Sequence, residues 1–194
     1  MDKAGVIFAL LTVLAVMVVS WFFAGVHVLM VTEQFEYKVL YELDNNVEVR
    51  QYGEMTVIST SLKDSGAVFS SLASYISGKN GENLKISMTS PVITSDQGTT
   101  LNMSFILPSG YDVNNAPEPD APNISIKTVP ARKLAAIRFS GYVNDKVVEQ
   151  QRYILSSQLN VNGVATKGEF FLMRYNPPWV PPALKRNEVA IEVD

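Results

Sequence analysis

Cysteine is absent from the 194-residue chain, and its one histidine, His27, lies within the apolar first 31 residues. The absence of cysteine excludes disulfides, thiolate metal sites and cysteine nucleophiles, and it leaves the redox compartment undetermined. The remaining sequence offers no histidine for a Ser-His-Asp triad, a histidine-rich zinc site or a histidine general base. We therefore expect that the protein is not an enzyme.

Charge is also sparse. Charged residues make up 18% of the chain, the net charge is −3, and no basic cluster stands out. Because nucleic-acid binding relies on groups of Lys and Arg that contact phosphates, we expect no nucleic-acid partner. The residues that follow the apolar leader number about 160, a comfortable length for one domain with one hydrophobic core.

A long apolar run, residues 5–31, opens the chain. As a helix rising about 1.5 Å per residue it is about 40 Å long, enough to span a bilayer core of about 30 Å with some tilt. A secretory signal has a shorter apolar region of about 7–15 residues, followed by a small-residue cleavage site. We predict that residues 1–31 form a retained transmembrane helix; a cleaved signal sequence is the alternative.

The flanks of this run favour one orientation. Lys3 precedes it and Glu33 and Glu36 follow it, which places the amino terminus in the cytoplasm. Trp21 falls late in the span, where an aromatic belt meets the lipid headgroups. The expected localisation is therefore a single-pass membrane protein with an extracytoplasmic domain.

The domain, residues 32–194, contains two runs that each read strand, strand, helix, strand, strand. Alternating apolar residues predict the strands, and apolar residues at helical spacing predict the helices. In the first run the expected elements are residues 47–52, 55–62, 66–77, 84–94 and 101–107. In the second run they are residues 124–129, 134–139, 144–159 and 169–174, and a closing strand through Val189 and Ile191.

This near-repeat predicts two halves, residues 47–107 and 124–194, related by a pseudo-twofold axis. The expected fold class is α+β: a distorted antiparallel β-barrel or strongly curved sheet with two helices packed on it. A cleft is expected where the helices and the sheet fail to close completely. Residues 108–123, which contain four prolines, are expected to form a surface loop.

Residues 175–186, which we call the proline segment, form a stiff stretch before the closing strand. Proline fixes φ and lacks an N–H group, and the residue before a proline is pushed into an extended conformation. The four prolines of the segment therefore predict a rigid crossing that presents Trp179. We expect Trp179 to plug the open end of the β-structure; the same rigid segment can also form one wall of a ligand cleft, and the two interpretations are compatible.

Two motifs resemble the SOUL/haem-binding protein family. Residues 85–92, KISMTSPV, are similar to its K-I-x-M-T-x-P-V signature, and residues 175–189, YNPPW followed by RNEV, resemble its closing segment. The resemblance covers about residues 40–194, the whole expected domain. It implies a distorted barrel of two βαββ-type halves that binds haem or another tetrapyrrole in a hydrophobic cleft. It also implies a fold shared with small-molecule-binding modules of bacterial transcription regulators.

The sequence departs from the family pattern at the positions that would hold haem. The histidine that some members use as an iron ligand has no counterpart, so a haem would be held by apolar packing or ligated by Tyr or Met. Members with basic residues on the first helix pair them with the propionates, but residues 66–77 contain no Lys or Arg. The nearby cations are Lys63, Lys79, Lys85, Lys185 and Arg186.

These observations predict membrane-anchored, non-catalytic binding of haem or a related tetrapyrrole in a hydrophobic cleft. The predicted binding residues are Phe69, Leu72, Tyr75, Ile76, Met88, Trp179, Lys185 and Arg186. For the helical and methionine positions, core packing is the competing interpretation. An interaction module without a ligand remains open, and its cleft would be filled by the protein's own side chains. A tetrapyrrole-acting enzyme is a weaker alternative, because no carboxylate pair stands out.

Overall fold

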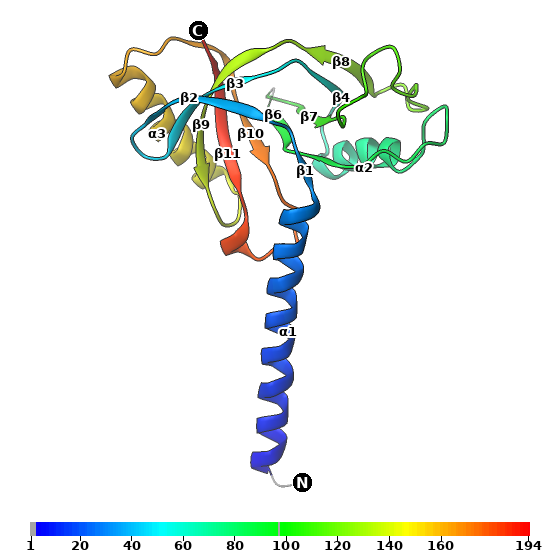
Figure 1. Cartoon of the computed structure of the whole chain (residues 1–194), viewed down its shortest axis with the longest axis vertical. Coiled ribbons are helices and arrows are strands. Elements are labelled where there is room, and N and C mark those ends of the chain that lie inside the picture. Colours follow the sequence, from blue (N-terminus) through cyan, green and yellow to red (C-terminus); the bar gives the residue numbers. More distant parts are fainter. Residues whose placement is uncertain (1–2, 97) are drawn as a thin grey trace.

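One helix, α1 (Lys3–Val31), projects from an α+β domain in the computed structural model, which describes residues 3–96 and 98–194 (Figure 1). Its apolar side chains are mostly exposed along its whole length. The stretch Lys3–Val28 is long and apolar enough to cross a membrane. A signal sequence can have the same length and composition, so the retained anchor and its orientation stay predictions.

The domain is built on a nine-stranded antiparallel sheet with the order β2-β3-β9-β11-β10-β6-β7-β4-β8. Its first strands are β2 (Tyr37–Leu43), β3 (Val47–Tyr52), β4 (Met55–Leu62), β6 (Val92–Asp96) and β7 (Leu101–Ile106). The others are β8 (Ser125–Val129), β9 (Arg132–Phe139), β10 (Thr166–Arg174) and β11 (Asn187–Val193). A short parallel pair, β1 (Glu33–Gln34) with β5 (Thr89–Ser90), holds the chain that leaves α1. The α+β class is confirmed.

The strand order is symmetric about the β10–β6 pair. Exchanging β3, β4, β6 and β7 with β8, β9, β10 and β11 reproduces the same neighbours, and β2 is the one strand of this sheet outside the exchange. This is the order that two twofold-related halves produce. The strands at the two ends of the order are β2 and β8, and closure of the sheet into a barrel stays a prediction.

Two helices cover one face of the sheet. The first, α2 (Ser65–Ile76), packs on β4 and β7, and the second, α3 (Asp145–Val161), packs on β9, β10 and β11 (Figure 1). Each begins at a residue whose side chain accepts a backbone N–H, Asp64 for α2 and Asn144 for α3. A short 3-10 helix, η1 (Pro182–Leu184), lies in the proline segment.

The sheet has apolar side chains on both faces. Under α3, Val47 and Val49 pack with Leu155 and Leu159, and a second cluster fills the space under α2. A third cluster lies on the opposite face, where Tyr52 of β3 meets side chains of β4, β7 and β9. Successive side chains of a strand point to opposite faces, so this cluster lies on the face that the helices leave uncovered. We call this the inner face of the curved sheet.

The first half differs from the sequence-based prediction in two places. Residues 84–88 were expected to begin a strand, and this is wrong. Instead, the Ile86 N–H donates to the Ile76 oxygen at 2.9 Å, and the Asn80 amide bonds both backbone groups of Leu84. These bonds hold the segment against the end of α2. In contrast, Tyr37–Leu43, which lies before the first expected strand, forms the edge strand β2.

The packing of α3 gives a stability prediction. Leu155 is fully buried under α3, so Leu155→Ala should lower the free energy of unfolding by about 2–5 kcal/mol through lost burial and a cavity. Val161, on the same helix, is 80% exposed, and Val161→Ala should change stability by about 0.5 kcal/mol or less. Denaturant unfolding of the full chain in detergent measures both; equal losses would contradict the assigned packing.

Candidate functional site

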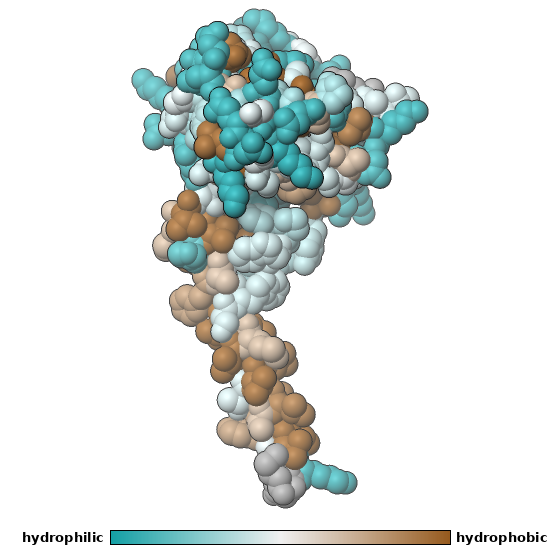
Figure 2. Space-filling view, turned by 90° about the vertical axis from the view of Figure 1, so that its right-hand side faces the viewer, coloured by the Kyte–Doolittle hydropathy of each residue, from teal (hydrophilic) through white to brown (hydrophobic). Residues whose placement is uncertain are grey.

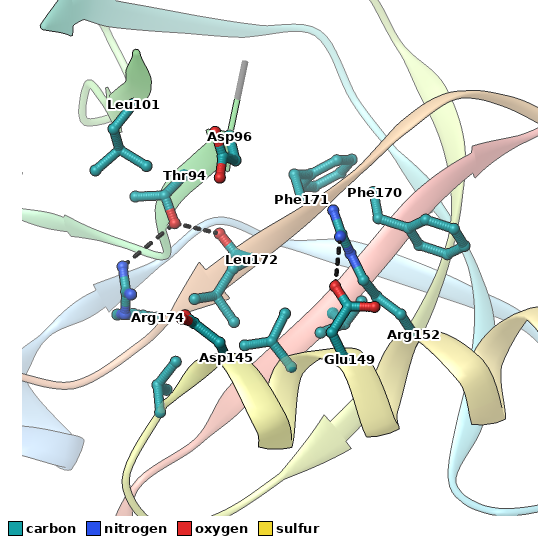
Figure 3. A pocket seen from close by; sticks show the side chains of 13 residues that line it. Thr94, Asp96, Leu101, Asp145, Glu149, Arg152, Phe170, Phe171, Leu172 and Arg174 are labelled. Atoms are coloured by element: carbon teal, nitrogen blue, oxygen red, sulfur yellow. Dashed lines mark hydrogen bonds and ion pairs between the residues drawn. The ribbon is translucent and has the colours of Figure 1, made fainter. Parts of the chain in front are cut away.

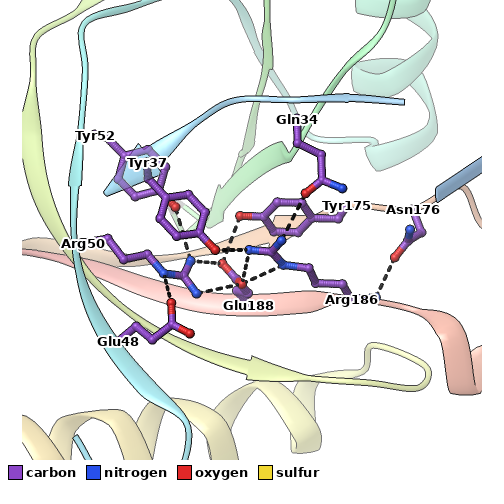
Figure 4. Close-up of polar contacts among 9 residues, drawn as sticks. All are labelled: Gln34, Tyr37, Glu48, Arg50, Tyr52, Tyr175, Asn176, Arg186 and Glu188. Carbon is purple, nitrogen blue, oxygen red and sulfur yellow. Dashed lines mark hydrogen bonds and ion pairs between the residues drawn. The ribbon is translucent and has the colours of Figure 1, made fainter. Parts of the chain in front are cut away.

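A buried carboxylate, Glu188 of β11, organises the polar interior of the sheet (Figure 4). Arg50 of β3 donates to it from Nη1 at 2.6 Å and from Nη2 at 3.1 Å. Arg186 donates from Nε at 2.9 Å, and the Tyr175 hydroxyl donates at 3.0 Å. The strand β9 lies between β3 and β11, and its Ala136 pairs with Glu48 of β3 and with Ala190 of β11.

Electrostatics fix the protonation of this cluster. Burial alone would raise the pKa of Glu188, but the hydrogen bonds and charges of Arg50 and Arg186 outweigh it and hold the pKa below its usual value. Burial and the neighbouring Glu188 charge raise the pKa of Tyr175 far above its ordinary range, so its hydroxyl stays a donor. The cluster is therefore an ionised structural network near neutral pH.

Arg186, a predicted propionate partner, is committed to this network. Besides Glu188 it donates to Gln34 Oε1 at 3.1 Å and to the Tyr37 hydroxyl at 2.9 Å. Its guanidinium carbon lies 3.8 Å from the Tyr175 ring centroid. Each of its side-chain nitrogens therefore has a partner, and the contacts join the proline segment to β1 and β2.

The predicted residues on α2 separate into two groups. Leu72 and Tyr75 are fully buried, Ile76 packs against the same core cluster, and the Tyr75 hydroxyl donates to the Pro117 oxygen at 2.7 Å. Phe69 is 45% exposed and meets the edge of Phe105 at 5.5 Å between centroids. Met88, just before β5, is 37% exposed. Phe69 and Met88 thus retain accessible apolar surface.

In the proline segment, the expectation that Trp179 plugs the β-structure is wrong. Trp179 is 48% exposed, whereas its neighbour Val180 is buried. Lys185 donates from Nζ to the Pro178 oxygen at 2.7 Å and lies 4.7 Å from the Tyr142 ring centroid. The eight predicted residues therefore fall in three places: the α2 side, the proline segment and the buried network.

A pocket with a volume of about 240 Å³ lies between α3 and the β6–β10 pair at the centre of the strand order (Figure 3). Its apolar lining consists of Leu101, Val143, Val148, Phe170, Phe171, Leu172 and Val189. Its polar lining consists of Thr94, Asp96, Asp145, Glu149, Arg152 and Arg174. The pocket thus combines an apolar floor with charged groups at its rim.

Arg174, at the end of β10, is the uncommitted cation of this pocket. It donates from Nη1 to Thr94 Oγ1 at 3.2 Å, and no carboxylate in residues 3–96 and 98–194 forms an ion pair with it. Burial lowers its pKa. Arg152 is already paired with Glu149 at 2.8 Å. Arg174 can therefore receive an anionic group from a ligand.

Sequence reasoning missed Arg174. The available signal was an arginine at the end of the apolar strand FFLMR, immediately before the proline segment. Arg186 lies at the other end of that segment, and the sequence does not show which of the two arginines is free to pair with a ligand carboxylate. The structure does, because Arg186 shares the buried Glu188 whereas Arg174 faces the pocket.

The pocket fits part of a tetrapyrrole. Ligand pockets commonly measure about 300–1,000 Å³, so this volume accommodates one edge of the ring system and not a whole enclosed haem. The apolar floor suits a pyrrole edge, and Arg174 suits its carboxylate. None of the lining residues is His, Cys, Met or Tyr, so the pocket itself supplies no side chain that commonly ligates haem iron.

Comparison with known proteins places the chain in a family. The family model described as SOUL heme-binding protein matches residues 32–192, and human Heme-binding protein 2 is 30% identical over 156 residues. That alignment covers 73% of this chain and 75% of the relative. The chain belongs to the SOUL heme-binding protein family. The resemblance noted in the two sequence motifs is thereby confirmed.

Several solved structures of low sequence identity share the fold. The crystal structure of the EcmrR C-terminal domain has a TM-score of 0.58 at 13% identity and covers 80% of this chain and 98% of its own. The crystal structure of a hydrolase from Listeria innocua has a TM-score of 0.56 at 8% identity and covers 79% of this chain and 94% of its own. At these identities the likeness concerns architecture alone.

The buried network gives a prediction on stability and pH. Glu188→Gln should lower the free energy of unfolding by about 3–5 kcal/mol near neutral pH, because it removes the buried carboxylate that two guanidinium groups share and leaves Arg50 only its pair with Glu48. Since the folded pKa of Glu188 is below its ordinary 4.5, the carboxylate's contribution is full above that pH and is lost as the pH falls through the folded pKa. The difference in free energy of unfolding between wild type and variant should therefore become smaller at acid pH.

The matched control is Glu192→Gln on the same strand. Glu192 pairs with Arg132 at 3.4 Å, with 36% of its own side chain exposed, so its loss should cost about 0–1 kcal/mol. Denaturant unfolding across a pH series compares the two variants. Equal costs near neutral pH, or a gap that stays constant into acid, would contradict the assigned role of Glu188.

Proposed function

We propose that this SOUL family protein is a membrane-anchored, non-catalytic binder of haem or a related tetrapyrrole. The observation that carries the site is the uncommitted Arg174 beside the apolar floor of the α3 pocket. A propionate paired with Arg174 would place the adjoining ring edge against Phe170 and Leu172, which share the α3 side of β10, and the rest of the ring would extend over the rim. Family membership supports the ligand class.

Phe69 on α2 and Met88 just before β5 each retain exposed apolar surface and are further candidate wall residues. Met88 also offers a thioether that could ligate haem iron from outside the α3 pocket. Lys79 lines a further pocket of about 270 Å³ next to α2. Haem supplies redox and ligand-binding chemistry when bound, and this chain's residues would supply apolar contact and a charge partner for the carboxylates.

The anchor is part of the proposal. A retained α1 would hold the domain at the bilayer surface, into which hydrophobic tetrapyrroles partition. The domain could then receive such a ligand directly from the membrane. Lys3 before the span and Glu33 after it favour an extracytoplasmic domain.

One observation favours a second function, a protein-interaction module. The inner face of the curved sheet is filled by the protein's own side chains, among them Tyr52, Met55, Val57, Ile106 and Leu134. That packing favours a contact surface elsewhere, and residues 108–123 or the proline segment would supply it. Absence of saturable porphyrin binding by the wild-type chain would favour this alternative.

The proposed site predicts a specific loss of affinity. Arg174→Ala should weaken binding of haem and of an iron-free porphyrin dicarboxylate about ten- to a hundredfold, the usual effect of losing a hydrogen bond to a charged group. Titration of the full chain in detergent, followed by the Soret band, measures it. A porphyrin with esterified propionates should bind wild type and variant equally, because it lacks the charge that Arg174 pairs.

Arg138→Ala is the control, because Arg138 is exposed on β9 and does not line the pocket. It should leave affinity unchanged. Phe69→Ala and Met88→Ala test the α2 side in the same titration. Affinity that falls with these two variants and not with Arg174→Ala would move the site to α2.

A further inference from the structure

The proline segment packs directly against α1. Trp21 donates from Nε1 to the Trp179 backbone oxygen at 2.7 Å. A Cβ atom on Gly25 would lie 2.7 Å from Pro181 Cδ and 3.3 Å from Leu184 Cδ1, so this close approach requires glycine. Trp21 and Gly25 lie one turn apart on the same face of α1. Gly25 is also buried, in a helix whose other side chains are mostly exposed.

The position of this contact along α1 gives its approximate depth in a bilayer that α1 crosses upright. At about 1.5 Å per residue, Trp21 lies about 27 Å from Lys3 and Gly25 about 33 Å from it, against a hydrocarbon thickness of about 30 Å. With Lys3 at one boundary of the hydrocarbon core, Trp21 and Gly25 straddle the other boundary. Figure 2 shows pale side chains against the upper part of the brown α1 column, below the teal domain.

The segment cannot withdraw independently of the sheet. Its base is closed by the Tyr175 N–H, which donates to the Arg186 oxygen at 3.2 Å, and by the Arg186 N–H, which donates to Asn176 Oδ1 at 2.6 Å. Arg186 is held in turn by the buried Glu188. In Figure 1 the loop between β10 and β11 descends beside α1, on the side of the domain away from the carboxyl terminus.

The exposed side chains of this region suit lipid headgroups. Trp179 is 48% exposed and Tyr142 is 66% exposed. The loop of Tyr142 is joined to the proline segment, because the Gly141 N–H donates to the Pro182 oxygen at 3.0 Å. Lys185 lies over the Tyr142 ring. Trp and Tyr are enriched at membrane interfaces, and a lysine there is attracted to anionic lipids.

We propose that the proline segment is a membrane-contact surface that sits in the headgroup layer of the bilayer that α1 spans. Its partner is the lipid surface itself, contacted by Trp179, Tyr142 and Lys185. This inference rests on the proposed anchor, α1, and adds a second contact of the domain with the bilayer.

The absence of native cysteine allows a direct test. Ala183→Cys in the exposed part of the segment and Thr166→Cys at the opposite end of β10 each introduce a single thiol for a fluorescent label. The labelled full chains are reconstituted in phosphatidylcholine–phosphatidylglycerol vesicles that carry a nitroxide-headgroup lipid. Quenching should be several times stronger at position 183 than at position 166.

A substitution in α1 tests the contact itself. Gly25→Leu should push Pro181 away and reduce quenching of the label at position 183, because the new side chain needs the space that the proline ring occupies. Ala24→Leu adds the same side chain at an exposed neighbouring position and should leave the quenching unchanged.

Vesicle flotation separates the two levels of the proposal. If the protein floats with the vesicles and positions 183 and 166 are quenched equally, the contact surface is refuted while the anchor stands. If the protein does not float, the anchor is refuted, and the contact surface with it. Both the anchor and the contact surface are supported if quenching is stronger at position 183, if Gly25→Leu reduces it, and if Ala24→Leu leaves it unchanged.

Discussion

The shared carboxylate of Glu188 is the constraint on which the arrangement of this domain depends. Removing a charge from water costs several kcal/mol, and here two guanidinium groups and a tyrosine hydroxyl offset that cost. Since Arg50 comes from β3 and Arg186 from the proline segment, strands far apart in sequence are held in one register. The network also uses Arg186, at one end of the proline segment, and leaves Arg174, just before the other end, without a carboxylate partner among the described residues.

Much of the fold could be predicted from the sequence, because local patterns carry it. Apolar spacing located α2 and α3, and the repeated order of elements matches the symmetric strand order. Residues 84–88 were mistaken for a strand because their backbone partners lie at the end of α2, which no alternation reveals. The edge strand β2 was missed since its burial pattern is weak.

The candidate site was less predictable, because it depends on long-range pairing. A helical stripe identifies Leu72 and Tyr75 as apolar positions, and their complete burial follows the usual role of such a stripe. The choice between Arg174 and Arg186 could not be made from sequence, since only the fold shows which one meets Glu188. The pocket itself joins α3 to β6, elements from different halves of the chain.

Because Gly25 packs against Pro181, the helix is joined to the domain by a direct contact and not only by a flexible linker. With α1 in a bilayer, such a domain cannot move far from the membrane surface or reorient freely relative to it. Its encounters with lipid-borne molecules become a search in two dimensions, at a fixed height and with a fixed face toward the membrane plane. Effective concentration then depends on lateral diffusion and surface density, and a weak intrinsic affinity suffices for occupancy.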